Sequence, residues 1–208
     1  TVKTIDNYGF WECGEASIHC HAEEPPVIYS ETFNNYSSNL LYVPVASILR
    51  YKSAEYWNRF SYAPQVVDGI YYDVMNETEV AVTFKDRHYN SYRGEVEVPV
   101  QVEIEGRTYR VTAVADRAFY ECDSLISVVL PNAIDSIGQY AFYSSESLKR
   151  VNIPESVTKI EQRAFYYCRS LSEIVIPEGV TEIGSWAFGN CYGLRNVTIP
   201  STVKIIDN

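Results

Sequence analysis

The chain has 208 residues, of which 46% are hydrophobic, so it can build the core of one domain or of two small ones. Its formal net charge of −10 disfavours nucleic acid as a partner, because an acidic protein repels a phosphate backbone. No apolar run approaches the ~20 residues that a transmembrane helix requires. The chain begins at Thr1 with neither a signal peptide nor an anchor, which favours a processed protein or a fragment.

Residues 1–62 predict short strands followed by one helix. The segments IHCHAEEPP and LLYVP are strand-like, and VASILRYKSAEYWNRF after Pro44 predicts a helix with Ser47 as its N-cap. The residues that this helix would turn toward a core are Leu49, Tyr56, Trp57 and Phe60.

The same region holds two of the three histidines. His19, His21 and Glu23 would share one face of a strand, with Cys20 on the other. Two imidazoles at this spacing can share a metal ion, but no motif supplies a third ligand. The favoured interpretation is an ordinary polar strand, so no metal site and no cofactor are predicted.

Residues 63–68 contain Pro64 and are predicted to be a linker. Residues 69–109 hold the segments GIYYDV, EVAVTF and EVEVPVQVEIEGRTYRV, which are typical of strands joined by tight turns. We predict a β-rich N-terminal cap here, which would protect the edge of the sheet that follows.

Residues 110–208 repeat one motif with a step of 23 residues. Ala-Phe recurs at Ala118-Phe119, Ala141-Phe142, Ala164-Phe165 and Ala187-Phe188. The apolar columns include Leu125, Leu148, Leu171 and Leu194, and each repeat carries one proline, at Pro131, Pro154, Pro177 and Pro200. The segment L-x-x-V-x-I-P is typical of a short strand that its proline ends. Because one repeat cannot bury its own apolar face, the repeats must stack into a solenoid with parallel sheets.

Three of the five cysteines belong to this repeat. Cys122, Cys168 and Cys191 share one column with Ser145, which indicates a small buried residue rather than a nucleophile. The last histidine is His88, so the repeats contain no imidazole base, and no P-loop, GxSxG, HExxH or dinucleotide fingerprint occurs. No catalytic residue is predicted, and an enzyme is the least expected class.

The repeat AFxxCxxLxxVxIPxxVxxI resembles the BspA-like leucine-rich repeat of bacterial surface proteins. The resemblance implies a leucine-rich-repeat solenoid of the α/β type, mostly β with short parallel strands. Members are secreted or surface-anchored and several are linked to adhesion. The resemblance therefore implies an extracellular or cell-surface location for this chain.

The N-terminal segment TVKTIDNYGFWEC fits the same repeat, with Ile5, Phe10 and Cys13 in their columns and Gly9 replacing the alanine. Residues 1–62 are therefore predicted to be the end of an array with a short C-terminal capping helix. TVKTIDN at the start and TVKIIDN at 202–208 differ at one position. The chain either spans a junction between tandem arrays or forms a head-to-tail or swapped homo-oligomer.

Two columns beside the phenylalanines are candidate contact surfaces. The first reads Tyr8, Arg117, Tyr140, Arg163 and Trp186, and the second reads Trp11, Tyr120, Tyr143, Tyr166 and Gly189. Stacked side chains of these types either stabilise the face or anchor an interface. The predicted ligand-binding residues are Tyr140, Arg163, Trp186, Tyr143 and Tyr166.

The leading hypothesis is a protein-binding or adhesion module that takes a host or bacterial surface protein. One alternative is a glycan-binding module, since exposed rings can stack on sugars. Another is a structural spacer or assembly unit without an external ligand.

Overall fold

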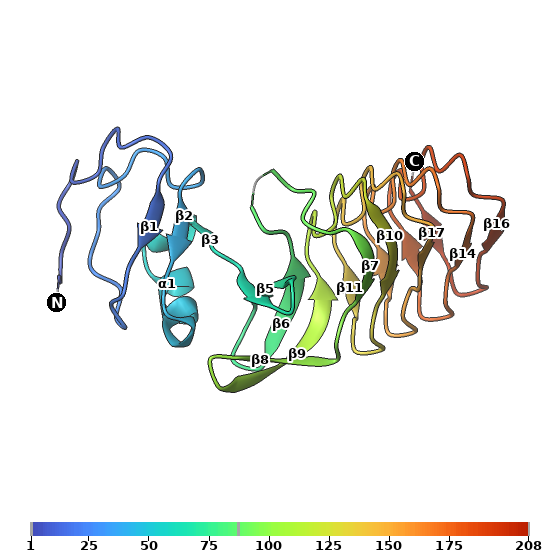
Figure 1. Ribbon diagram of the computed structural model, residues 1–208, viewed down its shortest axis with the longest axis horizontal. Helices are drawn as coiled ribbons and strands as arrows, with labels where there is room; N and C mark the ends of the chain where they lie inside the picture. Colours follow the sequence, from blue (N-terminus) through green and yellow to red (C-terminus); the bar gives the residue numbers. More distant parts are fainter. Residues whose placement is uncertain (1, 87, 208) are drawn as a thin grey trace. The chain divides into compact units, whose positions relative to one another are not determined.

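The computed structural model describes residues 2–86 and 88–207, and the chain divides into two compact units (Figure 1). The first unit comprises Thr1–Ala63 with Val74–Glu77. The second comprises Pro64–Asp73 with Thr78–Asn208.

The first unit contains a small parallel sheet in the order β1 (Ser17–His19), β2 (Leu40–Tyr42) and β3 (Ser61–Tyr62). Isolated parallel bridges join Thr4 to Val27 and Phe10 to Phe33. The phenylalanine rings of that second bridge stack at 5.1 Å. Successive turns of chain thus lie on one another.

The helix of the first unit is shorter than predicted. It spans only Ile48–Ser53 (α1), between the 3-10 turns Val45–Ser47 (η1) and Trp57–Arg59 (η2). Ser47 is the N-cap residue of this helix, as predicted, but its buried hydroxyl makes no capping hydrogen bond. Ala54 is extended and Tyr56 has a φ of 63°, so the chain leaves the helical path before Trp57.

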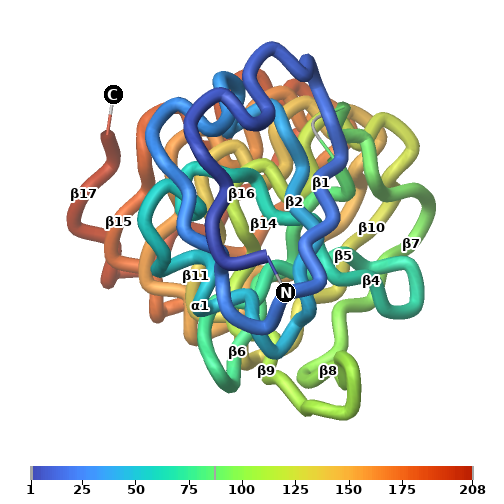
Figure 2. The backbone as a smooth tube through the Cα atoms, turned by 90° about the vertical axis from the view of Figure 1, so that its left-hand side faces the viewer, coloured from blue at the N-terminus to red at the C-terminus, as the bar shows by residue number. Residues whose placement is uncertain are grey.

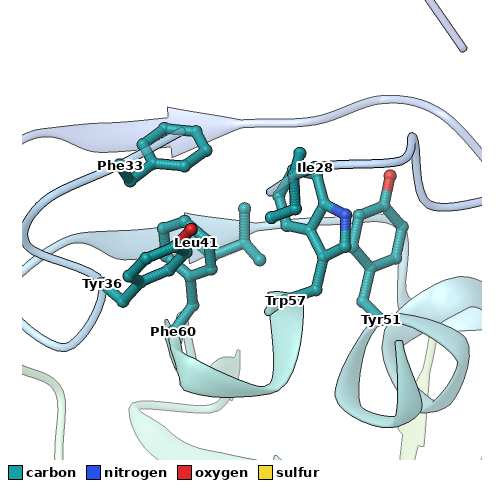
Figure 3. Packing of buried hydrophobic residues seen from close by; sticks show 7 residues of the cluster. All are labelled: Ile28, Phe33, Tyr36, Leu41, Tyr51, Trp57 and Phe60. Atoms are coloured by element: carbon teal, nitrogen blue, oxygen red, sulfur yellow. The ribbon is translucent and has the colours of Figure 1, made fainter. Parts of the chain in front are cut away.

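The core of this unit explains the break (Figure 3). Its buried members are Ile28, Phe33, Tyr36, Leu41, Tyr51, Trp57 and Phe60. The Trp57 indole N–H donates to the carbonyl of Pro26 at 2.6 Å, and its ring packs edge-on against Tyr51. Trp57 and Phe60 face the core as predicted, whereas Leu49 and Tyr56 are only partly buried. Packing of the indole therefore overrides helix propensity here.

The second unit begins with a hairpin. β4 (Gln65–Val67) pairs antiparallel with β5 (Ile70–Val74), with Val67 opposite Ile70. Asp68 and Gly69 form the turn with φ values of 50° and 79°. Asp-Gly is a strong hairpin signal, so residues 63–68 are largely part of a sheet rather than the free linker that we predict from Pro64.

The remaining strands of residues 69–109 surround β9 (Arg107–Val114). β6 (Glu79–Thr83) pairs parallel with β9, and β8 (Gln101–Ile104) pairs antiparallel with it. The hairpin of β8 and β9 extends below the coils of the repeats (Figure 2). β7 (Gly94–Glu97) pairs parallel with β10 (Leu125–Val129), with Val96 opposite Val128. This region thus supplies the neighbouring strand for the first repeat.

The repeats form two sets of short parallel strands. One set continues from β9 through β11 (Ser136–Ile137), β13 (Lys159–Ile160), β15 (Glu182–Ile183) and β17 (Ile205–Ile206). The other comprises β12 (Arg150–Val151) beside β10, and β14 (Glu173–Val175) beside β16 (Asn196–Thr198). Equivalent residues lie opposite each other, for example Glu173 and Asn196. The columns predicted from the sequence therefore stack.

The core of the repeats is a ladder of phenylalanine rings. Phe119, Phe142, Phe165 and Phe188 stack at successive centroid distances of 4.7, 5.0 and 5.2 Å, with interplanar angles of 7° or less. The first three are fully buried. Such a ladder gives neighbouring repeats one register, since a slip would move every ring away from its partner.

Candidate functional site

The turn that precedes each ladder phenylalanine has the same unusual backbone. Arg117, Tyr140, Arg163 and Trp186 have φ values of 53–57°, the left-handed region that residues with a Cβ seldom adopt. Backbone hydrogen bonds between repeats hold this conformation, for example from the Tyr140 N–H to the Gln162 carbonyl at 3.1 Å. Because the turn recurs in each repeat, these four side chains form one column.

The column alternates cations and rings. The Arg117 guanidinium lies 5.2 Å from the centre of the Tyr140 ring, and the Arg163 guanidinium lies 5.7 Å from it. Arg163 also donates from Nη1 to the Tyr140 hydroxyl at 3.0 Å. Tyr140 and Arg163 are half-buried, whereas Trp186 is 53% exposed. Side chains in this column are thus ordered before any partner arrives.

A second column carries stacked tyrosines. Tyr143 lies between Tyr120 at 4.9 Å and Tyr166 at 5.3 Å, with interplanar angles of 6° and 17°. Tyr89, from the loop after β6, extends the column by packing on Tyr120 at 4.9 Å. Both faces of Tyr143 are covered, so it offers solvent its edge and hydroxyl. This argues against sugar stacking on the tyrosine columns themselves.

Trp186 packs against Tyr166 of the tyrosine column. Its ring meets Tyr166 edge-on at 6.0 Å. The equivalent of the tyrosines in that repeat is Gly189, where an added Cβ would lie 2.8 Å from the Tyr166 ring and 2.9 Å from Trp186. Glycine therefore leaves the space in which the indole packs.

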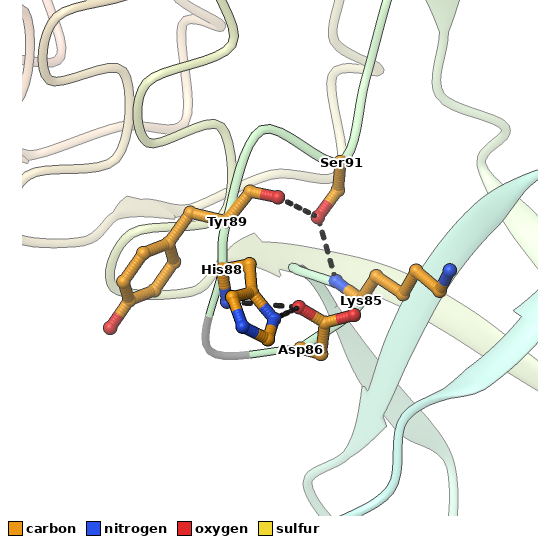
Figure 4. Close-up of polar contacts among 5 residues, drawn as sticks. All are labelled: Lys85, Asp86, His88, Tyr89 and Ser91. Carbon is orange, nitrogen blue, oxygen red and sulfur yellow. Dashed lines mark hydrogen bonds and ion pairs between the residues drawn. The ribbon is translucent and has the colours of Figure 1, made fainter.

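The loop that supplies Tyr89 is held by polar contacts (Figure 4). The backbone N–H of His88 donates to Asp86 Oδ1 at 2.9 Å, which lowers the pKa of Asp86. The backbone N–H of Lys85 donates to the Ser91 hydroxyl at 2.8 Å. Tyr89 could not be found from the repeat spacing, because its loop lies outside the repeat.

The cysteine column is structural. The thiols of Cys168 and Cys191 donate to the carbonyls of Phe142 and Phe165 at 3.1 and 3.0 Å. The Ser145 hydroxyl makes the same contact with Phe119 at 2.5 Å. In these three repeats a small donor thus satisfies a carbonyl of the preceding repeat, which explains why serine can replace cysteine. The Cys122 thiol instead donates to the Tyr120 carbonyl of its own repeat at 3.7 Å.

Burial also makes these thiols unreactive. It raises the pKa of Cys122 from 9.0 to about 11, and that of Cys191 to about 11 as well. The pKa of the fully buried Cys168 is raised well above its usual value for the same reason. Since the thiolate is the nucleophile, this column offers none at neutral pH.

These pKa shifts predict an alkaline loss of stability. Above pH 9 the unfolded thiols ionise while the native ones stay protonated, so the free energy of unfolding falls until about pH 11. Raising the pKa of the Cys122 thiol from 9.0 to about 11 corresponds to about 3 kcal/mol. Cys122→Ser should therefore lose about 3 kcal/mol less than the unaltered chain between pH 9 and 11, measured by urea unfolding in reducing buffer. Cys13→Ser, at an exposed thiol, is the control, and equal losses in both variants would contradict the interpretation.

The histidines of the first unit are not assembled into a metal centre. The His19 ring stacks on Tyr42 at 4.3 Å and 9°. Across residues 2–86 and 88–207 there is no group of three or more His, Cys, Asp or Glu side chains that could hold a metal ion.

Comparison with known protein families identifies the family of this chain. The family described as "BspA type Leucine rich repeat region" matches residues 102–208 in six copies. The chain belongs to the BspA-type leucine-rich repeat family. Leucine-rich repeats of this family form a general protein-interaction fold, and their members are typically binding modules without enzymatic activity.

Solved structures agree with the BspA-type assignment. A leucine-rich repeat protein from Bacteroides ovatus is 30% identical with a TM-score of 0.64, and one from T. pallidum is 31% identical with a TM-score of 0.58. A leucine rich cell surface protein from Faecalibacterium prausnitzii is 27% identical with a TM-score of 0.52. Each match covers 69% of this chain, but only 37%, 64% and 44% of those proteins, respectively.

No curated protein matches the chain. Within the described part of this BspA-type chain, no helix is long and apolar enough to cross a membrane.

Proposed function

We propose that this chain is an extracellular or cell-surface module that binds a protein through its aromatic and arginine columns. The observation that carries the proposal is the preordered column of Tyr140, Arg163 and Trp186 beside the stacked Tyr143 and Tyr166. Tyrosine, tryptophan and arginine are the usual anchors of protein interfaces. Side chains that are already fixed lose less conformational entropy on binding.

The proposed location rests on similarity. The F. prausnitzii relative, to which this chain is 27% identical, is described as a leucine rich cell surface protein. A surface location also suits a partner that is a host or bacterial surface protein. The proposed role is recognition and adhesion without catalysis.

A double substitution tests the column. Arg163→Ala with Trp186→Ala should weaken binding to an immobilised partner at least about tenfold, because two anchors are lost. Both alanines keep the Cβ, so the backbone strain at these left-handed positions does not change. Binding is measured by surface plasmon resonance on fibronectin, laminin and collagen, with thermal unfolding of each variant to show that it is folded.

A matched control lies on β14. Glu173→Ala with Val175→Ala removes one charge and one apolar side chain from exposed strand positions, and Val175 is 68% exposed. It should leave binding unchanged. Equal binding by both double variants would overturn the assignment of the column.

A further inference from the structure

Two arginines in the column of cations and rings carry charges that no acidic side chain pairs with. Within the residues that the structure describes, neither Arg117 nor Arg163 forms an ion pair with an aspartate or a glutamate, although the chain has 27 acidic residues. Several other cations do form ion pairs with glutamates, namely Arg50, Arg110, Lys159 and Arg169. The two column arginines lie instead against the Tyr140 ring, at 5.2 and 5.7 Å from its centre.

The side chains that neighbour these arginines in sequence supply little free negative charge. Asp116 precedes the first arginine, but its Oδ1 accepts a hydrogen bond from the backbone N–H of Gln139 at 2.8 Å. Gln139 and Gln162 occupy the equivalent position in the next two repeats, and both are uncharged. The carboxylate of Glu161 lies 3.4 Å from Lys159 Nζ, so it is already paired.

Glu121 and Arg117 act in opposite directions on Tyr120. Burial and the charge of Glu121 raise the pKa of Tyr120 to about 12, and the charge of Arg117 opposes this rise. Glu121 therefore offsets part of the charge of Arg117. Arg163 lies two repeats further on, where Tyr167 occupies the repeat position of Glu121, so Arg163 is the less neutralised of the two.

Arg163 and Tyr140 retain hydrogen-bond donors that lie close together. Arg163 Nη1 donates to the Tyr140 hydroxyl at 3.0 Å, which uses one of the five N–H groups of a guanidinium. Because the hydroxyl accepts this bond, its own proton remains available to an acceptor. A carboxylate has two oxygens and can accept from both groups, and hydrogen bonds between charged partners are the stronger ones.

The spacing of the two arginines also suits a peptide chain. Neighbouring repeats are 4.7–5.0 Å apart in the phenylalanine ladder, and Arg117 and Arg163 are two repeats apart. Their positions in the column are therefore about 10 Å apart. A polyproline II segment completes one turn of three residues in ~9 Å. Acidic residues three positions apart in such a segment thus match the two arginines.

We propose that the column binds an acidic segment of its protein partner, with carboxylates that pair with Arg117 and Arg163. This inference rests on the proposed function and names the chemistry of the partner. The net charge of −10 repels an acidic segment at a distance, but at physiological salt the repulsion is screened beyond about 8 Å. The surface as a whole favours basic segments, so a preference for an acidic one at this column is a specific prediction.

Three peptides of equal length test the proposal, each titrated against the isotope-labelled chain in physiological salt. They consist of four copies of Glu-Pro-Ala, of Gln-Pro-Ala or of Lys-Pro-Ala. Binding is followed by NMR shifts of the side-chain N–H signals of Arg117 and Arg163. The glutamate peptide should bind with a Kd on the order of 0.1–1 mM. The glutamine peptide should bind at least about tenfold more weakly, because it lacks the charges.

Charge variants locate the binding. Arg117→Gln with Arg163→Gln should weaken binding of the glutamate peptide at least about tenfold and leave that of the glutamine peptide unchanged. Lys149→Gln with Arg150→Gln is the matched control, since it removes the same charge from exposed residues at the start of β12, and it should change the Kd less than about twofold. Tyr140→Phe keeps the ring, loses the hydroxyl donor and should weaken binding about threefold.

Equal binding of the glutamate and glutamine peptides would overturn the proposal. Tighter binding of the lysine peptide at the two arginine signals, or equal losses in the two double charge variants, would also overturn it. Oligogalacturonate is titrated as an acidic sugar, and shifts with it but not with the glutamate peptide would assign the arginines to a glycan instead.

The matrix-protein assay with Arg163→Ala and Trp186→Ala keeps the proposed function separate from this inference. If that variant loses protein binding but the glutamate peptide does not bind, the protein-binding function stands and the acidic partner is overturned. If the glutamate peptide binds and the charge variant abolishes its binding, the acidic preference is supported, whichever matrix proteins bind.

Discussion

Replacing Phe142 by alanine is expected to lower the free energy of unfolding of the second unit by about 3–5 kcal/mol. Phe142 is fully buried and lies between Phe119 and Phe165, at 4.7 and 5.0 Å. Alanine would remove both stacking contacts and leave a cavity between two repeats. The ladder on either side holds the backbone, so the cavity cannot close by a local shift.

Urea unfolding followed by circular dichroism measures this change. Val175→Ala is the control, because Val175 is 68% exposed and its truncation should change stability by no more than about 0.5 kcal/mol. A loss below about 1 kcal/mol for Phe142→Ala would show that the phenylalanine ladder does not carry the core of the repeats.

The largest effect in the first unit is expected at Trp57. Its side chain is 2% exposed, packs on Tyr51 at 5.1 Å and on Phe60 at 5.5 Å, and donates to the Pro26 carbonyl. Trp57→Ala should destabilise this unit by about 3–5 kcal/mol. Trp57→Phe keeps a ring but loses the hydrogen bond, and should cost about 1–2 kcal/mol.

Amide hydrogen exchange locates this effect. In Trp57→Ala, exchange should accelerate in peptides from residues 17–62, which contain β1 to β3, and less in peptides from residues 118–190. Such a pattern follows if each compact unit has its own core. Uniform acceleration along the chain would show instead that the two units unfold together.

The repeat architecture could be predicted from sequence because one physical requirement recurs at a constant step. Each Ala-Phe pair and each leucine must be buried, and a single repeat cannot bury them, so stacking follows. The same reasoning predicts a small buried residue at the cysteine column. The structure adds the reason why cysteine and serine are equivalent there, which is a hydrogen bond to the phenylalanine carbonyl of the preceding repeat.

Interruptions of the pattern were harder to predict. The helical periodicity after Pro44 indicates one long helix, yet Trp57 is held in the core by Pro26, 31 positions earlier in the chain. Helix propensity depends on residues that are close in sequence, so it cannot predict such a long-range contact. Residues 63–68 are predicted to be a linker because they contain Pro64. Asp68-Gly69 is the stronger signal, because this dipeptide forms the turn of the hairpin between β4 and β5.

For the candidate site too, the sequence predicts one part and only the tertiary structure shows the other. Repeat spacing alone determined that Tyr140, Arg163 and Trp186 share one column, and that Tyr143 and Tyr166 share another, because residues at one repeat position must stack. Only the tertiary structure decided which ring faces remain open. Tyr143 is covered on both sides by its neighbours, and Tyr140 lies between Arg117 and Arg163. Exposure depends on the direction in which each turn projects its side chain and on what packs beside it, and periodicity carries neither.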